Sequence, residues 1–279
     1  MILLDGKALS DKRGAELREK FAALSEKARL AIVRVGTVPE SEVYIKRKAA
    51  FGESINVEVK IIELPENISE IALIEEIQKL NSDTSTHGII LQLPIPKNLN
   101  REKVLNTISP EKDVDGITAI NMWRLMDTTP NLIPATALGV CTLLEAYNLP
   151  IEGKHVVVVG DSLLVGKPTA LYFLHKEATV TVCHDKTQNL ANFTKQADIL
   201  VVAVGKPDLI TKDHVHPAQI VIDVGINKLE KGNLVGDVSY DEVKEVVAAI
   251  TPVPGGVGPM TVVSLFENLL KAIQTGHSN

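Results

Sequence analysis

The segment that decides the fold reads His155-Val156-Val157-Val158-Val159-Gly160 and continues Asp161-Ser162-Leu163-Leu164-Val165-Gly166. Four consecutive valines ending at a glycine predict a fully buried strand, because β-branched residues favour strands and a strand covered on both faces needs no polar alternation. A helical pattern follows over 165–175. The segment therefore predicts a strand–turn–helix unit, the building block of a parallel sheet.

Strands and helices alternate along the whole chain. Further strands are predicted over 30–35, 57–64, 89–93, 179–183, 199–204 and 220–224. This alternation indicates an α/β architecture with largely parallel sheets. The spacing of about 20 residues in the second half is typical of a dinucleotide-binding fold.

The chain has 279 residues, enough for two domains of ordinary size. We expect an N-terminal α/β domain over 1–136 and a Rossmann-like domain over 137–259, with a cleft between them. The final helix, over 260–279, is expected to pack back on the N-terminal domain.

Composition excludes several classes of protein. The net charge is −6 and no stretch is strongly basic, so we expect no nucleic-acid partner. Cys141 and Cys183 lie in apolar segments, which argues against a disulfide framework and favours a reducing compartment. No apolar run approaches the length of a membrane span. The apolar stretch at the N-terminus, before the first charged residue, is too short for the core of a signal peptide. We expect a cytoplasmic protein that does not bind membranes.

The turn from Gly160 to Gly166 is suited to phosphate. It follows a buried strand and precedes a helix, whose N-terminal N–H groups attract anions. Ser162 occupies the place of the second glycine in the standard fingerprint, so an ordinary strand–helix turn is the alternative. The surrounding strands favour the nucleotide interpretation.

The residue after the second strand of such a unit faces the adenosine ribose. A carboxylate there favours NAD, whereas a cation or hydroxyl favours the 2′-phosphate of NADP. Asp161 and Asp185 are acidic and Lys186 opposes them. Both acids could equally be solvated loop residues.

The predicted helix after residue 37 carries Ser41, Tyr44 and Lys48 at i, i+3 and i+7, which places them on one stripe. Tyr44 could stack on an aromatic ligand. Lys48 could act as an acid or base if partial burial lowers its pKa. The alternative is a solvent-facing stripe.

Two further polar features stand in apolar surroundings. Gln92, at the end of a predicted strand, is either a core amide or a ligand contact, because ligands bind outside the carboxyl ends of strands. Asp113 and Asp115 precede Gly116 and suggest a turn, although one carboxylate could recognise the donor-rich edge of a heterocycle. The histidines lack the spacing of metal ligands, and we expect no metal.

The run Thr251-Pro252-Val253-Pro254-Gly255-Gly256-Val257-Gly258-Pro259 has three glycines, three prolines and no charge. This composition predicts a loop that is neither helix nor central strand. It is either a tight turn or a stretch of bare backbone that approaches a flat ligand.

Taken in order, these motifs resemble the bifunctional methylenetetrahydrofolate dehydrogenase/methenyltetrahydrofolate cyclohydrolase (FolD) family. The resemblance covers about residues 3–272. It is carried by Ser41-x-x-Tyr44-x-x-x-Lys48, Gln92-Leu93-Pro94-Ile95-Pro96, Lys112-Asp113-Val114-Asp115-Gly116, Val221-Ile222-Asp223-Val224-Gly225-Ile226-Asn227, Val235-Gly236-Asp237-Val238 and the run over 251–261.

The resemblance implies a multifunctional enzyme of one-carbon metabolism and purine biosynthesis. It would transfer a hydride from 5,10-methylenetetrahydrofolate to a nicotinamide, then hydrolyse the methenyl product to 10-formyltetrahydrofolate. The resemblance also implies a homodimer formed through the nucleotide domains. Two alternatives are a dehydrogenase without the hydrolytic step and a non-catalytic nucleotide-binding protein on the same fold. The intact stripe with Gln92 argues against both.

Site residues follow from the resemblance. Lys48 would be the main catalytic residue, Gln92 would orient it, Tyr44 would stack on the aminobenzoyl ring, Asp115 would bind the pterin, and Ser41 would support the site. The implied folate contacts also include Leu93, Pro254, Gly255 and Gly256. The implied cofactor contacts are Gly160, Asp161, Ser162, Val165, Gly166, His184, Asp185, Lys186, Gly225, Ile226 and Asn227.

The chain departs from the family at three places. Many relatives have Pro-Cys-Thr-Pro where this chain has Pro134-Ala135-Thr136-Ala137, so we assign no role to a cysteine at this place. Asp161 and Asp185 are acidic where many relatives are not, and both would repel a 2′-phosphate. NADP is the family's usual cofactor and the expected one here, with NAD as the alternative because of these two acids.

Overall fold

The computed structural model describes residues 1–279 except 38, 128, 230–231 and 277–279. The chain forms two compact units. Unit 1 comprises Met1–Asp11 and Thr136–Thr261, and unit 2 comprises Lys12–Ala135 and Val262–Asn279. Both units are α/β structures, so the predicted two-domain α/β fold is confirmed.

Unit 2 is built on a three-stranded parallel sheet with β2 in its centre. The strand order is β3-β2-β4, with β2 at Arg29–Val35, β3 at Glu58–Leu64 and β4 at Gly88–Leu91. Leu30 pairs with Val59 on one side and with Gly88 on the other. The side chains of β2 point alternately to the two faces, as strand geometry requires.

Each face of this sheet has its own hydrophobic core. Leu30 and Ile32 pack in a cluster with Phe266, whereas Ala31 and Val33 pack in the cluster on the opposite face. Burial on both faces explains why β2 reads as a nearly continuous apolar run. The helices of this unit are α2 (Pro39–Ser54), α3 (Glu70–Ser82), α4 (Arg101–Leu105) and α5 (Ala119–Met126), with parts of α1 (Gly6–Ala22) and α10 (Val257–Gly276).

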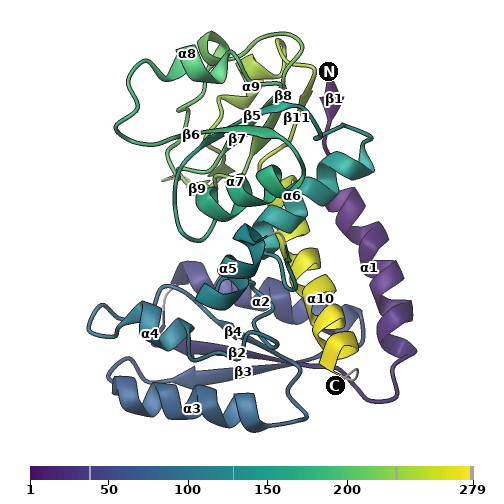
Figure 1. The fold of residues 1–279 in the computed structure, drawn as a ribbon, viewed down its shortest axis with the longest axis vertical. Coiled ribbons are helices and arrows are strands. Elements are labelled where there is room, and N and C mark those ends of the chain that lie inside the picture. The colour runs from purple at the N-terminus through teal and green to yellow at the C-terminus, as the bar shows by residue number, and fades with distance from the viewer. Residues whose placement is uncertain (38, 128, 230–231, 277–279) are drawn as a thin grey trace. The chain divides into compact units, whose positions relative to one another are not determined.

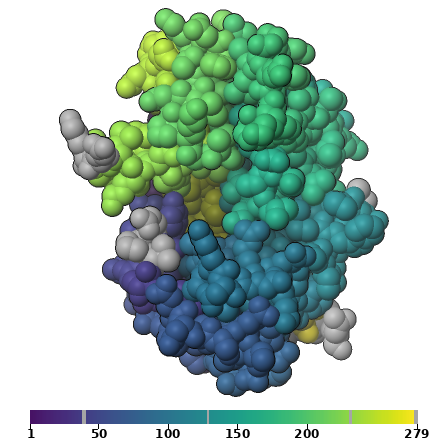
Figure 2. All heavy atoms as spheres, turned by 90° about the vertical axis from the view of Figure 1, so that its left-hand side faces the viewer, coloured from purple at the N-terminus to yellow at the C-terminus, as the bar shows by residue number. Residues whose placement is uncertain are grey.

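In Figure 1, α3 lies on one face of the β3-β2-β4 sheet, and α2 and α10 lie on the other. Val104 of α4 packs in the same cluster as Leu73 of α3. The helix α10 is a core element: Phe266 and Leu269 are fully buried in the same cluster as Leu30. On the face drawn in Figure 2, α10, coloured yellow, shows only small areas.

Unit 1 is a six-stranded sheet whose neighbouring strands are all parallel. The strand order is β1-β11-β8-β7-β5-β6. The strands are β1 (Ile2–Leu3), β5 (His155–Val159), β6 (Thr179–Cys183), β7 (Ile199–Val202), β8 (Ile220–Asp223) and β11 (Ala249–Ile250). The valine run thus forms the interior strand β5, as predicted.

Helices and one hairpin complete unit 1. In Figure 1, α6 and α7 lie on one side of the sheet and α8 and α9 on the other. The helices are α6 (Ala135–Ala146), α7 (Gly166–His175), α8 (Leu190–Thr194) and α9 (Tyr240–Val243), with a 3-10 turn at Lys212–His214. An antiparallel hairpin joins β9 (Asn227–Lys228) to β10 (Leu234–Val235).

Two boundaries differ from the sequence expectation. The first eleven residues group with unit 1, not with an N-terminal domain over 1–136, because β1 pairs with β11: Ile2 is aligned with Ala249. A two-residue strand of this kind leaves no periodicity to detect.

The second difference concerns the Gly/Pro run. Helix α10 begins at Val257, inside the run, and not at 260 as expected. Pro259 is the third helical residue, and the first turn of a helix needs no backbone N–H from it. The residues 277–279 of the predicted final helix lie outside the described residues.

Candidate active site

In unit 2, polar side chains gather where β2 and β4 end. Gln92 follows β4 directly, and its N–H donates to the Val33 carbonyl at 2.8 Å. Lys48 Nζ donates to Gln92 Oε1 at 3.2 Å, and Gln92 Nε2 donates to the Leu93 carbonyl at 2.9 Å. The amide is therefore oriented by its backbone and presents its oxygen to the amine.

Helix α2 supplies the three residues of the predicted stripe. Ser41 Oγ donates to the Leu93 carbonyl at 3.2 Å, so the hydroxyl and the Gln92 amide converge on the same oxygen. Tyr44 is half-buried, and this burial raises the pKa of its phenol while the Arg47 charge lowers it. The stripe is thus part of a polar cluster and not a purely solvated face.

The electrostatics favour loss of a proton from Lys48. Burial lowers the pKa of the Lys48 amine, and the Asp115 charge opposes this in part. Burial also raises the pKa of Asp115, which Lys48 lowers and Asp113 raises further. Burial thus shifts the pKa values of Lys48 and Asp115 towards each other. Shifts of this kind are expected at sites of acid–base chemistry near neutral pH.

Asp113 and Asp115 have different surroundings. The Asp113 carboxylate accepts the N–H groups of Gly116 at 3.0 Å and Thr118 at 2.8 Å, and Asn121 Nδ2 at 2.9 Å. These bonds shape the turn. Within the described part of the chain, the Asp115 carboxylate accepts no hydrogen bond, whereas Asp113 accepts three.

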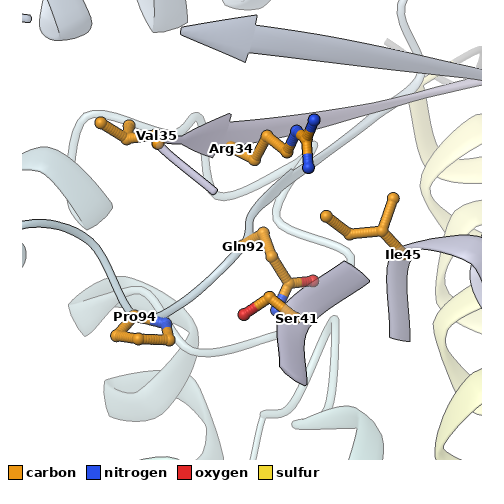
Figure 3. Close-up of a pocket in the computed structure, with 7 residues that line it drawn as sticks. Arg34, Val35, Ser41, Ile45, Gln92 and Pro94 are labelled. Carbon is orange, nitrogen blue, oxygen red and sulfur yellow. The ribbon is translucent and has the colours of Figure 1, made fainter. Parts of the chain in front are cut away.

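Figure 3 shows a small hollow beside these residues, where Gln92 and Ser41 lie next to each other. It is lined by Arg34, Val35, Gly36, Ser41, Ile45, Gln92 and Pro94. Sequence reasoning missed the residues at the end of β2. The rule that drew attention to Gln92, ligands at the carboxyl ends of strands, applies equally to Val35 and Gly36.

In unit 1, the turn after β5 is closely packed backbone. Gly160 has φ of +115°, and a Cβ there would meet the Ala203 carbonyl. A Cβ on Gly166 would meet the Gly160 carbonyl. The Ser162 hydroxyl accepts the N–H groups of Val165 at 3.2 Å and Gly166 at 3.3 Å, so it caps the start of α7. The backbone of this turn therefore leaves no room for a side chain at either glycine.

The predicted ribose-facing residues are all exposed. Asp161 pairs with Lys167 at 3.9 Å. Lys186 Nζ pairs with Asp185 at 2.8 Å, and His184 Nδ1 lies 3.8 Å from the same carboxylate. The hydrogen bond from Lys186 lowers the pKa of Asp185. The negative charge of Asp185 is therefore accompanied by an adjacent cation.

The Gly/Pro run and the segment after β8 approach each other within unit 1. A Cβ on Gly258 would lie 3.7 Å from Ile226 Cδ1. The carbonyl of Gly255 accepts the Lys7 N–H at 2.8 Å, so the start of α1 holds the run in place. Pro254 is exposed, and the Val253–Pro254 and Leu93–Pro94 bonds are cis.

The expected residues therefore fall into two groups. Unit 2 brings together Ser41, Tyr44, Lys48, Gln92, Leu93 and Asp115, and unit 1 contains the predicted cofactor residues with Pro254, Gly255 and Gly256. Among the described residues, no group of three or more His, Cys, Asp or Glu could hold a metal ion. No helix in the described part of the chain is long and apolar enough to cross a membrane.

We predict that Gly166→Ala weakens nucleotide binding. The new Cβ would collide with the Gly160 carbonyl, so the turn must open and its N–H groups lose their alignment. We expect the Kd for NADP, measured by titration calorimetry, to rise by about tenfold or more. Gly276→Ala is the control, since nothing lies within 4 Å of its Cβ position. An unchanged Kd for Gly166→Ala would contradict the assignment of this turn.

Comparisons with known proteins identify the family of this chain. Residues 4–115 match the family model for the tetrahydrofolate dehydrogenase/cyclohydrolase catalytic domain, and residues 134–277 match the model for its NAD(P)-binding domain. The bifunctional protein FolD of Exiguobacterium sibiricum is 45% identical over 97% of this chain and 99% of its own.

Solved structures give the same result. The bifunctional FolD dehydrogenase/cyclohydrolase of Campylobacter jejuni is 44% identical, covers 99% of both chains and superposes with a TM-score of 0.97. The FolD enzyme of Trypanosoma brucei, solved with NADP cofactor and inhibitor, is 33% identical over 100% of this chain and 99% of its own, with a TM-score of 0.95. The chain belongs to the tetrahydrofolate dehydrogenase/cyclohydrolase family.

Proposed function

We propose that this protein oxidises 5,10-methylenetetrahydrofolate to 5,10-methenyltetrahydrofolate with a nicotinamide nucleotide, and then hydrolyses the product to 10-formyltetrahydrofolate. The observation that carries the proposal is the cluster of Lys48, Gln92 and Asp115, found in a chain that matches both domain models of the bifunctional family. A dehydrogenase without the hydrolytic step would not need the hydrogen-bonded pair of Lys48 and Gln92.

Lys48 serves the hydrolytic step. Water forms a bond to the cationic methenyl carbon and loses a proton, which the Lys48 amine accepts because its pKa is lowered by burial. The hydroxyl then loses its proton and becomes the formyl C=O as the bond from this carbon to N5 breaks and N5 takes up a proton. The formyl group stays on N10, and one proton is released overall. Gln92 holds the amine in position through the 3.2 Å hydrogen bond.

The folate is held by other residues of unit 2. Asp115 accepts hydrogen bonds from the donor-rich edge of the pterin, because its carboxylate accepts none within the described residues. Tyr44 stacks on the aminobenzoyl ring. Ser41 supports the site through the Leu93 carbonyl.

The residues of unit 1 fit a dinucleotide. When bound, the nucleotide supplies C4 of its nicotinamide as the hydride acceptor. Its phosphates are held by the turn formed by Gly160, Ser162, Val165 and Gly166, whose backbone packs too closely for a side chain on either glycine. Gly225, Ile226 and Asn227 border the nicotinamide.

We propose NADP as the cofactor, with NAD as the alternative. Asp161 and Asp185 disfavour a 2′-phosphate, but Lys186 contacts Asp185 at 2.8 Å and Lys167 lies 3.9 Å from Asp161. A neighbouring cation reduces the repulsion from each acid. His184, whose Nδ1 lies 3.8 Å from the Asp185 carboxylate, is a further residue of this cofactor site.

We also propose that the protein forms a homodimer through the nucleotide domains. We propose that it is located in the cytoplasm and acts in one-carbon metabolism and purine biosynthesis.

A two-part assay tests the activity. The protein is supplied with methylenetetrahydrofolate and either NADP or NAD, while absorbance follows the reduced nicotinamide and the methenyl product. We expect both oxidation and a hydrolysis rate above that of the uncatalysed reaction. No oxidation with either nucleotide would refute the dehydrogenase activity, and methenyl decay at the uncatalysed rate would leave only the monofunctional alternative.

We predict that Lys48→Met abolishes hydrolysis. The methionine keeps most of the side-chain volume but cannot accept a proton, so hydrolysis of added methenyltetrahydrofolate should fall by about a hundredfold or more. Lys46→Met is the matched control, because Lys46 is exposed on the same helix and pairs with Glu42 at 3.9 Å. Hydrolysis that persists in Lys48→Met would show that another residue accepts the proton.

We predict that Asp185→Ser shifts the nucleotide preference towards NADP. Removing the carboxylate leaves Lys186 free to meet the 2′-phosphate, so the ratio of kcat/KM for NADP to that for NAD should rise by about threefold or more. Asp213→Ser, at another exposed acid of unit 1, controls for the change in net charge. If both variants give the same ratio, Asp185 plays no part in the preference.

A further inference from the structure

Two buried aspartates of unit 1, Asp223 and Asp237, have no role in the reaction as described so far. Asp223 is the last residue of β8, and Asp237 follows the hairpin strand β10. Their exposed fractions are 3% and 0%. Within the described residues neither forms an ion pair with Lys, Arg or His. A buried carboxylate without a cation needs an equivalent set of hydrogen bonds.

Asp237 receives its hydrogen bonds from two separate loops. Oδ2 accepts the backbone N–H groups of Val204 at 2.7 Å and Gly205 at 2.9 Å. Oδ1 accepts the N–H of Lys206 at 2.8 Å and Asn227 Nδ2 at 2.8 Å. Three consecutive N–H groups directed at one carboxylate form an anion-binding nest, which a side chain of the protein itself fills. The acid thereby ties the loop after β7 to the segment after β8.

Asp223 extends this arrangement towards the Gly/Pro run. Its Oδ1 accepts the N–H groups of Gly225 and Asp237, both at 3.0 Å, and Oδ2 accepts the Val238 N–H at 2.9 Å. Its own N–H donates to Thr251 Oγ1 at 2.7 Å. Burial raises the pKa of Asp223 to about 7, and the three N–H donors oppose that rise.

Glycines allow the loops to close on both acids. A Cβ on Gly225 would meet the Asp237 carboxylate, and a Cβ on Gly236 would meet the Asp223 carboxylate. Neither glycine has a positive φ, so it is the close approach and not the backbone shape that excludes a side chain. The two acids and the two glycines therefore form one closely packed cluster at the carboxyl ends of β7 and β8.

We propose that Asp237, held in place by Asp223, is a positioning residue: by tying the segment after β8 to the loop after β7, it preorganises the segment that borders the nicotinamide nucleotide. This rests on the proposed function, which assigns Gly225, Ile226 and Asn227 to that border. An aspartate is needed because each of its oxygens accepts two N–H donors, whereas an asparagine has one accepting oxygen and would turn its NH₂ towards other donors. Loops held before binding do not lose entropy on binding.

The variant Asp237→Asn tests this proposal. NADP binding is measured by titration calorimetry without folate, and the hydrolysis of added methenyltetrahydrofolate is measured without nucleotide. We expect the Kd and the KM for NADP to rise by about tenfold or more, with the KM for folate and the hydrolysis rate within about twofold of the parent. Asp241→Asn, at a side chain that is 93% exposed, is the control and should change none of these values.

Two outcomes would overturn the proposal: an unchanged Kd for NADP, or an equal loss of hydrolysis and nucleotide binding, which would indicate a general structural role. A second measurement on the parent protein needs no variant. Hydrogen exchange of the Val204, Gly205 and Lys206 amides in the nucleotide-free protein should be at least about tenfold slower than in an unstructured peptide. Unprotected exchange there would also overturn it.

The positioning role of Asp237 and the proposed enzymatic activity can fail independently of each other. If the parent binds NADP but oxidises no methylenetetrahydrofolate, the proposed function fails, while the calorimetric comparison of Asp237→Asn with the parent still decides the positioning role.

Discussion

Parallel strands all end at the same edge of their sheet, and the placement of the polar residues in both units depends on this constraint. In unit 2 it brings Gln92, at the end of β4, to the level where β2 ends. In unit 1 it brings together the loops that follow β5, β7 and β8. Because strands such as β4, β5 and β7 are buried on both faces, their polar neighbours lie at these edges.

The polar groups at these edges are stabilised in two different ways. In unit 2 the Lys48 amine has one amide partner and an acidic neighbour, so burial leaves its pKa lowered and the group able to react. In unit 1 the Asp237 carboxylate has four N–H donors and is fully satisfied. The first arrangement suits a group that exchanges protons, and the second suits one that fixes the shape of a loop.

Much of the site could be predicted from local pattern. The stripe of Ser41, Tyr44 and Lys48 follows from helical periodicity, and the position of Gln92 follows from the end of a strand. The distinction between Asp113 and Asp115 could not be predicted, because it depends on which carboxylate the N–H groups of Gly116 and Thr118 reach.

The sequence by itself determined the α/β class, the buried strand at β5, the glycine turn that follows it and the family to which the chain belongs. These are properties of short segments, and short-range sterics and periodicity govern them. Only the tertiary structure decided that β1 joins the sheet of unit 1, that Lys7 holds Gly255 and that Asp237 joins two loops. Each of these contacts links residues far apart in the chain, and their pairing depends on packing that no local pattern encodes.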